Sequence, residues 1–184
     1  MPQQTMITTI TPADEAAINE LFEKLSDAWA CGDGLAYSSL FIEDARFVGV
    51  VGFRLVGNKI IRERHQEMFD GIFKYSRLDG MPGKVIQGLT SDVVLVHVDG
   101  DIYFPGESAK EVKPSGLRTL SLVKRNGVWK VASFQNTPTG SFRHLKFIRR
   151  FLSSRIYLLR PEWKKAYQQT LVEKQRTIEK WKHQ

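Results

Sequence analysis

Segments with a helical period come first in this chain and segments with a strand period follow, and this order is the feature that most limits its fold. Apolar residues recur at intervals of three or four between 12 and 41 and again between 58 and 73. From 85 to 137 the chain instead reads as strands separated by turn residues. This order is typical of an α+β domain, in which helices cover one face of a curved, mainly antiparallel sheet.

Capping residues mark where the helices are expected to begin and end. Thr11 is predicted to cap the first helix, and Gly32 ends it because glycine adopts the left-handed conformation without strain. Asp33 is then predicted to cap a short second helix that carries Leu35, Leu40 and Phe41. A third helix starts at 57–58 and has His65 on its apolar side.

The strand-like segments form two predicted hairpins. One hairpin joins 85–89 to 93–98, and the other joins 117–124 to 128–134 through an Asn-Gly turn. Asn-Gly between two strand-like runs is a strong hairpin signal. The stretch 105–115 between the hairpins is polar and rich in Pro, Gly and Lys, so it is predicted to be a mobile loop and a candidate lid.

Both faces of the predicted sheet are partly apolar. A bent strand pair is expected within 47–56, and in the strand 93–98 apolar residues occupy both alternating sets of positions. One face is expected to cover the helices and a pocket. The other face needs a second cover, which is either the C-terminal segment or another subunit, and we therefore expect a homodimer through the sheet.

Positive charge is concentrated at the C-terminal end of the chain. Residues 142–184 hold twelve Lys or Arg and three Asp or Glu, whereas 1–141 hold fifteen and seventeen. The chain is therefore predicted to comprise a flexible N-terminus (1–11), one domain (12–140) and a basic amphipathic helical extension (141–184).

The sequence leaves three possible contacts for the basic extension. Its apolar stripe packs on the domain's own or a partner's sheet, or it lies on a membrane surface, or its cationic residues contact nucleic acid. The stripe is widened by additional apolar residues, namely Phe147, Phe151 and Leu158. This width favours burial in protein or lipid over contact with nucleic acid.

Composition argues against several protein classes. Cys31 is the only cysteine, so an internal disulfide and a four-cysteine metal site are excluded. The four histidines lack a ligand spacing such as His-x-x-x-His, and we expect no metal site. Residues 1–11 hold no Lys or Arg, and the chain has no apolar run of about eighteen residues, so neither a signal peptide nor a membrane span is expected. A cytoplasmic location is the expectation.

Four short motifs stand out within 12–138. They are Ala-Trp-Ala-Cys-Gly-Asp at 28–33, Leu-Phe-Ile-Glu-Asp-Ala at 40–45, His65 in the third helix and Ala-Ser-Phe-Gln-Asn-Thr at 132–137. Together these motifs resemble the SgcJ/EcaC family of the nuclear-transport-factor-2-like (SnoaL-like) superfamily. The basic extension is not part of that pattern.

The resemblance implies a cone-shaped domain in which three N-terminal helices pack on a strongly curved sheet. It also implies an enclosed hydrophobic pocket and dimerisation through the sheet. Some relatives bind hydrophobic natural products, and others are cofactor-free isomerases, cyclases or dehydratases. The family is often labelled as oxidoreductase, but this sequence has no nucleotide or flavin motif, and we expect no cofactor.

Aromatic and basic side chains are the main candidates for the pocket. Trp29, Phe41, Phe47 and Phe69 are predicted to line or floor it, although each also fits an ordinary core. His65 either serves as a general base or ligand contact, or it is a core histidine satisfied by one hydrogen bond.

Arg118 has two interpretations of equal weight. In one, it holds a carboxylate or enolate oxygen of a ligand in the pocket. In the other, it is an edge or dimer-facing residue paired with a carboxylate such as Asp44.

Gln135 and Asn136 are neighbours in a predicted strand, so their side chains point to opposite faces. Gln135 is favoured for the pocket because it shares the alternation of Trp129 and Val131, provided that the strand has no bulge.

Two catalytic arrangements find no support in the sequence. Ketosteroid isomerases of this fold have a base aspartate shortly after an Asp-Ala pair, but here Asp44-Ala45 is followed by Arg-Phe-Val-Gly. Nothing in the sequence marks Cys31 as an activated nucleophile.

Three functions therefore compete. The first is a small-molecule-binding protein that holds an apolar ligand through His65, Arg118 and Gln135. The second is a cofactor-free cyclase, isomerase or dehydratase for a hydrophobic or polyketide-like substrate, with His65 as the base. The third is a dimeric assembly module whose basic extension binds a partner or a membrane surface.

Overall fold

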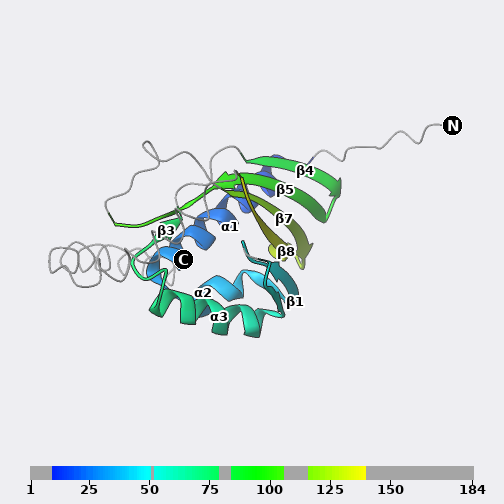
Figure 1. Ribbon diagram of the computed structural model, residues 1–184. Coiled ribbons are helices and arrows are strands. Elements are labelled where there is room, and N and C mark those ends of the chain that lie inside the picture. Colours follow the sequence, from blue (N-terminus) through cyan, green and yellow to red (C-terminus); the bar gives the residue numbers. More distant parts are fainter. Residues whose placement is uncertain (1–9, 51, 79–83, 106–115, 140–184) are drawn as a thin grey trace, which may run out of the picture.

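The computed structural model describes residues 10–50, 52–78, 84–105 and 116–139. The predicted basic extension (141–184), nearly all of the predicted N-terminal segment and all but the first residue of the predicted lid lie outside these residues. The described part has the predicted α+β class, with helices on the inner side of a curved sheet (Figure 1).

The described residues form three helices, α1 (Pro12–Cys31), α2 (Gly34–Ser39) and α3 (Asn58–Asp70). The Thr11 hydroxyl accepts a hydrogen bond from the Asp14 backbone N–H and caps α1 as predicted. Gly32 ends α1 at a φ of 65°, where a side chain would be strained. The carboxylate of Asp33 then accepts a bond from the Ala36 N–H and caps α2.

Six strands form the main sheet in the order β2-β1-β8-β7-β5-β4. All neighbouring pairs are antiparallel except β1 with β8, which is parallel. Two further strands, β3 and β6, pair separately. The strand bounds are β1 (Phe41–Val48), β2 (Arg54–Val56), β3 (Arg77–Leu78), β4 (Val85–Thr90), β5 (Val93–Gly100), β6 (Ile102–Tyr103), β7 (Gly116–Arg125) and β8 (Val128–Pro138).

Both predicted hairpins are confirmed, as β4–β5 and β7–β8. In the second hairpin Asn126 and Gly127 have φ of 53° and 78°, which is the paired left-handed geometry that favours an Asn-Gly turn.

The second helix is shorter than the sequence predicts, and the prediction that it carries Leu40 and Phe41 is wrong. Phe41 begins β1, where it lies opposite Val131 of β8, and the Leu40 carbonyl accepts a bond from the Val131 N–H at 2.9 Å. Pairing with a strand from the far end of the chain thus overrides the local helical pattern.

A bulge interrupts the pairing of β7 with β8. Ser121 lies opposite Ser133, but its neighbour Leu122 lies opposite Val131, so Ala132 is an extra residue. Because a bulge shifts the alternation by one residue, Trp129, Val131 and Phe134 are all buried. A strand with regular alternation would instead have Phe134 on the face opposite Trp129.

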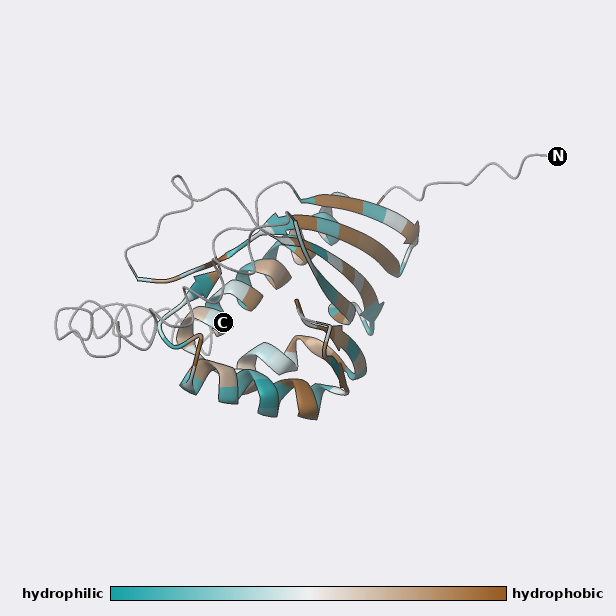
Figure 2. Cartoon of the chain, in the orientation of Figure 1, coloured by the Kyte–Doolittle hydropathy of each residue, from teal (hydrophilic) through white to brown (hydrophobic). Residues whose placement is uncertain are grey.

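The inner face of the sheet supplies much of the core. Alternate residues of β5, namely Val94, Val96 and Val98, are fully buried and belong to the same hydrophobic core as the apolar stripe of α1. Brown, apolar stretches run along the strands of the sheet in Figure 2 and are interrupted by teal, polar residues. Within the described ranges, no helix is long and apolar enough to cross a membrane.

Candidate functional site

Six buried rings gather where α1, α2, β1 and α3 meet, and we call them the aromatic cluster: Trp29, Tyr37, Phe41, Phe47, His65 and Phe69. The His65 imidazole contacts most of them. Its centroid lies 4.5 Å from the Tyr37 ring in a stacked geometry and 4.9 Å from the Phe47 ring in an edge-on geometry. All five aromatic and histidine candidates on the helices and first strand thus lie together.

His65 is held in one tautomer by the backbone of its own helix. Its Nδ1 lies 2.8 Å from the Ile61 carbonyl oxygen, which only accepts hydrogen bonds, so Nδ1 carries the proton. Nε2 is left with a lone pair, and it is buried with no hydrogen-bond partner among the described residues. Burial lowers the pKa of His65 to about 4, and the imidazole is neutral near pH 7.

Arg118 lies on the inner face of β7, the strand between β5 and β8. Its exposed fraction is 3%, so the interpretation of Arg118 as an edge residue paired with Asp44 is wrong. Within the described segments Arg118 forms no salt bridge, and its Nη1 atom is buried without a hydrogen-bond partner. The guanidinium lies directly over Gly100, where an added methyl group would be 2.0 Å from Nη1.

Asn136, and not Gln135, points to the inner face. It lies directly opposite Arg118 on the neighbouring strand, whereas Gln135 is exposed. The preference for Gln135 is wrong because the bulge at Ala132 reverses the alternation that Trp129 and Val131 establish. The Asn136 Oδ1 atom is also buried without a hydrogen-bond partner in the described part of the chain.

These three atoms have a common significance. His65 Nε2, Arg118 Nη1 and Asn136 Oδ1 are the buried side-chain nitrogen and oxygen atoms that lack a hydrogen-bond partner in the parts of the chain that the structure describes. Buried polar atoms are nearly always hydrogen-bonded, so each exception calls for an explanation. All three belong to residues that the sequence marks as site candidates.

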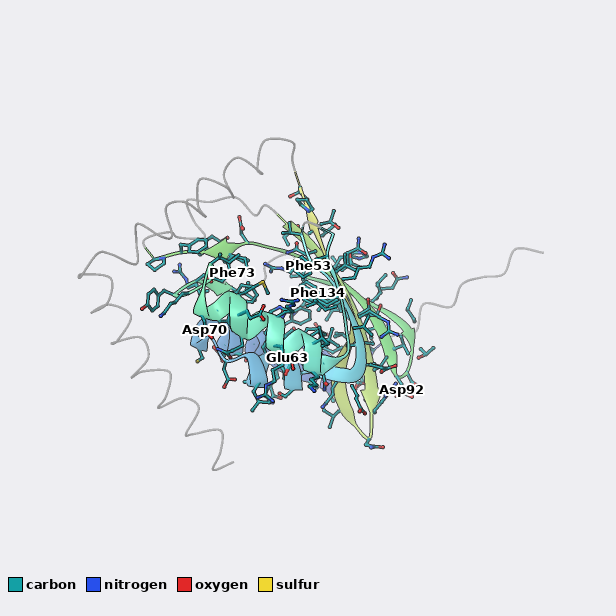
Figure 3. All side chains as sticks on the ribbon, turned by 60° about the horizontal axis from the view of Figure 1, so that its bottom comes forward. Phe53, Glu63, Asp70, Phe73, Asp92 and Phe134 are labelled. Carbon is teal, nitrogen blue, oxygen red and sulfur yellow. The ribbon has the colours of Figure 1, made fainter. Side chains whose placement is uncertain are left out.

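Stacked rings connect the histidine to the arginine–asparagine pair. Phe47 contacts His65 and stacks on Phe134 with centroids 4.6 Å apart, and Phe134 precedes Asn136 by two residues on the same face. Phe53 also stacks with Phe47, with centroids 6.2 Å apart. Figure 3 shows Phe53 and Phe134 close together beside the sheet, whereas Phe73 lies toward the far end of α3.

Trp29 has its polar atom engaged in the fold. Its Nε1 donates to the Ser76 hydroxyl at 3.0 Å, and that hydroxyl donates to the Phe73 carbonyl at 2.6 Å. Trp29 therefore contributes ring surface to the aromatic cluster and offers no free hydrogen-bonding group.

Sequence reasoning missed Tyr37, Phe134 and Gly100. Tyr37 lies in a helix of six residues, which is too short for a periodic signal. Phe134 was missed because the bulge at Ala132 turns it to the inner face. Gly100 leaves room for the Arg118 side chain from another strand, and no local sequence pattern predicts such a contact.

The described residues contain no cluster of three or more His, Cys, Asp or Glu that could hold a metal ion. No protein-family model matches this chain. A search of curated proteins also found no match.

Solved structures, by contrast, match over most of the chain. A domain of unknown function with a cystatin-like fold from Nostoc punctiforme is 26% identical, with a TM-score of 0.62 over 90% of this chain and 99% of that one. Two proteins from Novosphingobium aromaticivorans also match. One, provisionally named an aromatic ring hydroxylase, is 18% identical, with a TM-score of 0.61 over 72% of this chain and 94% of that one.

The other, provisionally named a scytalone dehydratase, is 16% identical, with a TM-score of 0.57 over 70% of this chain and 85% of that one. These similarities define the class of the protein by its fold. The described residues form a cystatin-like domain of the nuclear-transport-factor-2-like kind.

Proposed function

We propose that this protein binds a small, mainly apolar molecule between its helices and the inner face of its sheet. The observation that carries the proposal is the set of three buried polar atoms, on His65, Arg118 and Asn136, that have no hydrogen-bond partner among the described residues. We also propose that the chain belongs to the SgcJ/EcaC family, because its motifs at 28–33 and 132–137 supply the α1 cap and the inner end of β8.

The energetic argument favours a ligand over an unoccupied site. Each buried polar group without a partner costs about 1–3 kcal/mol of stability. A ligand that offers a donor to His65 Nε2 and Asn136 Oδ1 and an acceptor to Arg118 Nη1 removes those costs. The aromatic rings beside these atoms provide the apolar contact area.

Thermal unfolding with a panel of apolar ligands tests the proposal. A ligand at about 100 times its Kd stabilises the folded protein by about 2.7 kcal/mol, which raises Tm by several degrees. Replacing Asn136 by Ala should weaken the binding of a hit by about fivefold, the effect of one lost hydrogen bond. Replacing Gln135 by Ala is the matched control, because that neighbour is exposed. A panel that never raises Tm contradicts the proposal.

A second candidate function is a cofactor-free cyclase, isomerase or dehydratase. The fixed, neutral imidazole of His65 favours it, because the Nε2 lone pair is suited to accept a proton from a substrate. The buried guanidinium of Arg118 would then stabilise the enolate oxygen that forms. The provisional name of the scytalone dehydratase from Novosphingobium aromaticivorans is consistent with this class of reaction.

The enzyme hypothesis is tested on hydrophobic and polyketide-like substrates. Replacing His65 by Gln should abolish turnover while binding is retained, because glutamine cannot act as a base. Retained turnover in H65Q would reject His65 as the base.

A further inference from the structure

Arg118 is a buried positive charge whose partner is not supplied by the described residues. We propose that the ligand is a flat, apolar hydroxycarboxylic acid whose carboxylate binds the Arg118 guanidinium. The inference rests on the proposed ligand-binding function and names the chemical class of that ligand.

The charge of Arg118 selects an anion. Guanidinium remains protonated in proteins, and a buried charge without a partner is strongly unfavourable. The groups that act on it electrostatically are Tyr37, Asp101 and Tyr103. Burial raises the pKa of Tyr37, so that phenol is neutral near pH 7. Asp101 is the one carboxylate of the three, and no salt bridge joins it to Arg118 in the described part of the chain.

The position of the guanidinium is fixed by a glycine. A methyl group at Gly100 would lie 2.0 Å from Nη1 and 2.8 Å from Cζ, so the planar group rests on the backbone of β5. A planar guanidinium in this position suits the planar carboxylate, which accepts two parallel N–H bonds. A single carbonyl or hydroxyl oxygen offers neither that geometry nor a charge.

The hydroxyl requirement comes from the two acceptor atoms. Asn136 lies opposite Arg118 in the sheet register, and its Oδ1 atom needs a donor. His65 Nε2 needs a donor as well, at the other end of the stacked Phe134 and Phe47 rings. A hydroxyl close to the carboxylate satisfies Asn136, and a flat apolar body extends along the rings to a second hydroxyl that donates to His65.

Isothermal titration calorimetry at pH 7 tests the proposal with 3,7-dihydroxy-2-naphthoic acid, its methyl ester and naphthalene-2,6-diol. We expect the acid to bind at least about tenfold more tightly than the ester, because only the acid carries a charge for Arg118. Replacing Arg118 by Met should reduce this preference to less than about twofold, because only the affinity for the acid is lowered.

Replacing Gly100 by Ala is a second variant that keeps the charge of the chain. The added methyl group displaces the end of a flexible side chain, so the fold is expected to tolerate it and the acid should again lose affinity. Arg125 lies exposed at the end of the same strand, and its replacement by Met is the matched control that should leave the preference unchanged.

The outcomes separate this proposal from the proposed function. Equal binding of the acid and its ester by the wild-type protein overturns the carboxylate proposal and leaves ligand binding intact. The same holds if both R118M and G100A keep the full preference. Binding of none of the three compounds contradicts both. Circular dichroism of each variant establishes that it is folded, and G100A decides the question if R118M is not.

Discussion

The Tyr37 ring stacks on the His65 imidazole with centroids 4.5 Å apart and planes inclined by 29°. Together with the Ile61 carbonyl, this contact leaves the imidazole one orientation, and the buried lone pair of Nε2 has no hydrogen-bond partner among the described residues. The geometry makes His65 a fixed acceptor in a nonpolar environment, and its titration is a direct measure of that environment.

Stability should fall as the pH drops from about 6.5 toward 4. The pKa of His65 is lowered in the folded protein to about 4, so between these values the unfolded chain binds the extra proton. The contribution of neutral His65 to the free energy of unfolding is fully present above pH 6.5, and about 3 kcal/mol of it is lost by pH 4. Urea unfolding from pH 4 to 8 measures this slope.

Replacing His65 by Gln should remove that part of the slope, because glutamine does not titrate. A slope that survives H65Q unchanged would show that other groups produce it.

Asp14 ties the start of α1 to the β7–β8 hairpin. Its Oδ1 accepts hydrogen bonds from Lys124 Nζ and Trp129 Nε1, each at 2.9 Å. Replacing Asp14 by Asn should lower Tm by several degrees, because the charge-assisted bond to Lys124 is lost. Replacing Asp92, whose carboxylate lies 3.8 Å from the same Lys124 and is mostly exposed, should change Tm little.

The stabilisation by Asp14 should be lost as the pH falls, because its carboxylate must be ionised to hold the charged Lys124. The hydrogen bonds from Lys124, Trp129 and Thr11 lower the Asp14 pKa from 3.8 to about 2. Its stabilisation is therefore complete above pH 3.8 and is lost as the pH falls through about 2. The Tm difference between wild type and D14N should narrow over that range, and a constant difference would contradict the assignment.

Deleting Ala132 should convert the bulge into regular pairing. Without the extra residue, Val131 and Ser133 become neighbours and keep their partners Leu122 and Ser121, so Phe134 and Asn136 stay on the inner face and Gln135 stays on the outer face. We expect the deletion variant to keep its fold and its ligand binding, because the inner face of β8 keeps the same residues. Loss of ligand binding would contradict this register. Replacing Ala132 by Ser keeps the chain length and should preserve both properties. Thermal unfolding and calorimetry compare the two variants.

We propose that residues 142–184 serve assembly, since their excess of Lys and Arg accompanies a wide apolar stripe. Their deletion should change the number of subunits, as measured by analytical ultracentrifugation, if they cover a subunit interface. It should abolish binding to anionic vesicles if they lie on a membrane. A deletion variant with an unchanged number of subunits and unchanged vesicle binding would contradict the proposal. Ligand binding serves as the control for an intact domain.

Features set by neighbouring residues were predictable from the sequence. The Thr11 and Asp33 caps, the left-handed Gly32 and the Asn-Gly turn each depend on a few adjacent positions, and all are confirmed. His65, Phe47 and Phe69 were recognised because an apolar period surrounds them.

Features set by pairing across the chain were not predictable. The start of β1 at Phe41 depends on Val131, and the inward position of Asn136 depends on the register between β7 and β8. The place of Arg118 over Gly100 likewise requires two strands to be aligned first. A single sequence contains no local signal for such alignment, so a one-residue bulge was enough to reverse the choice between Gln135 and Asn136.

The parallel pairing of β1 with β8 has a consequence for synthesis of the protein. A ribosome that has released only the first half of the chain exposes β1 without the strand that completes it, and α2 and α3 have no finished sheet to cover. The nascent chain must wait for its last strand before its interior can close. Until then it presents unpaired strand edges and apolar rings, which are the features that molecular chaperones bind.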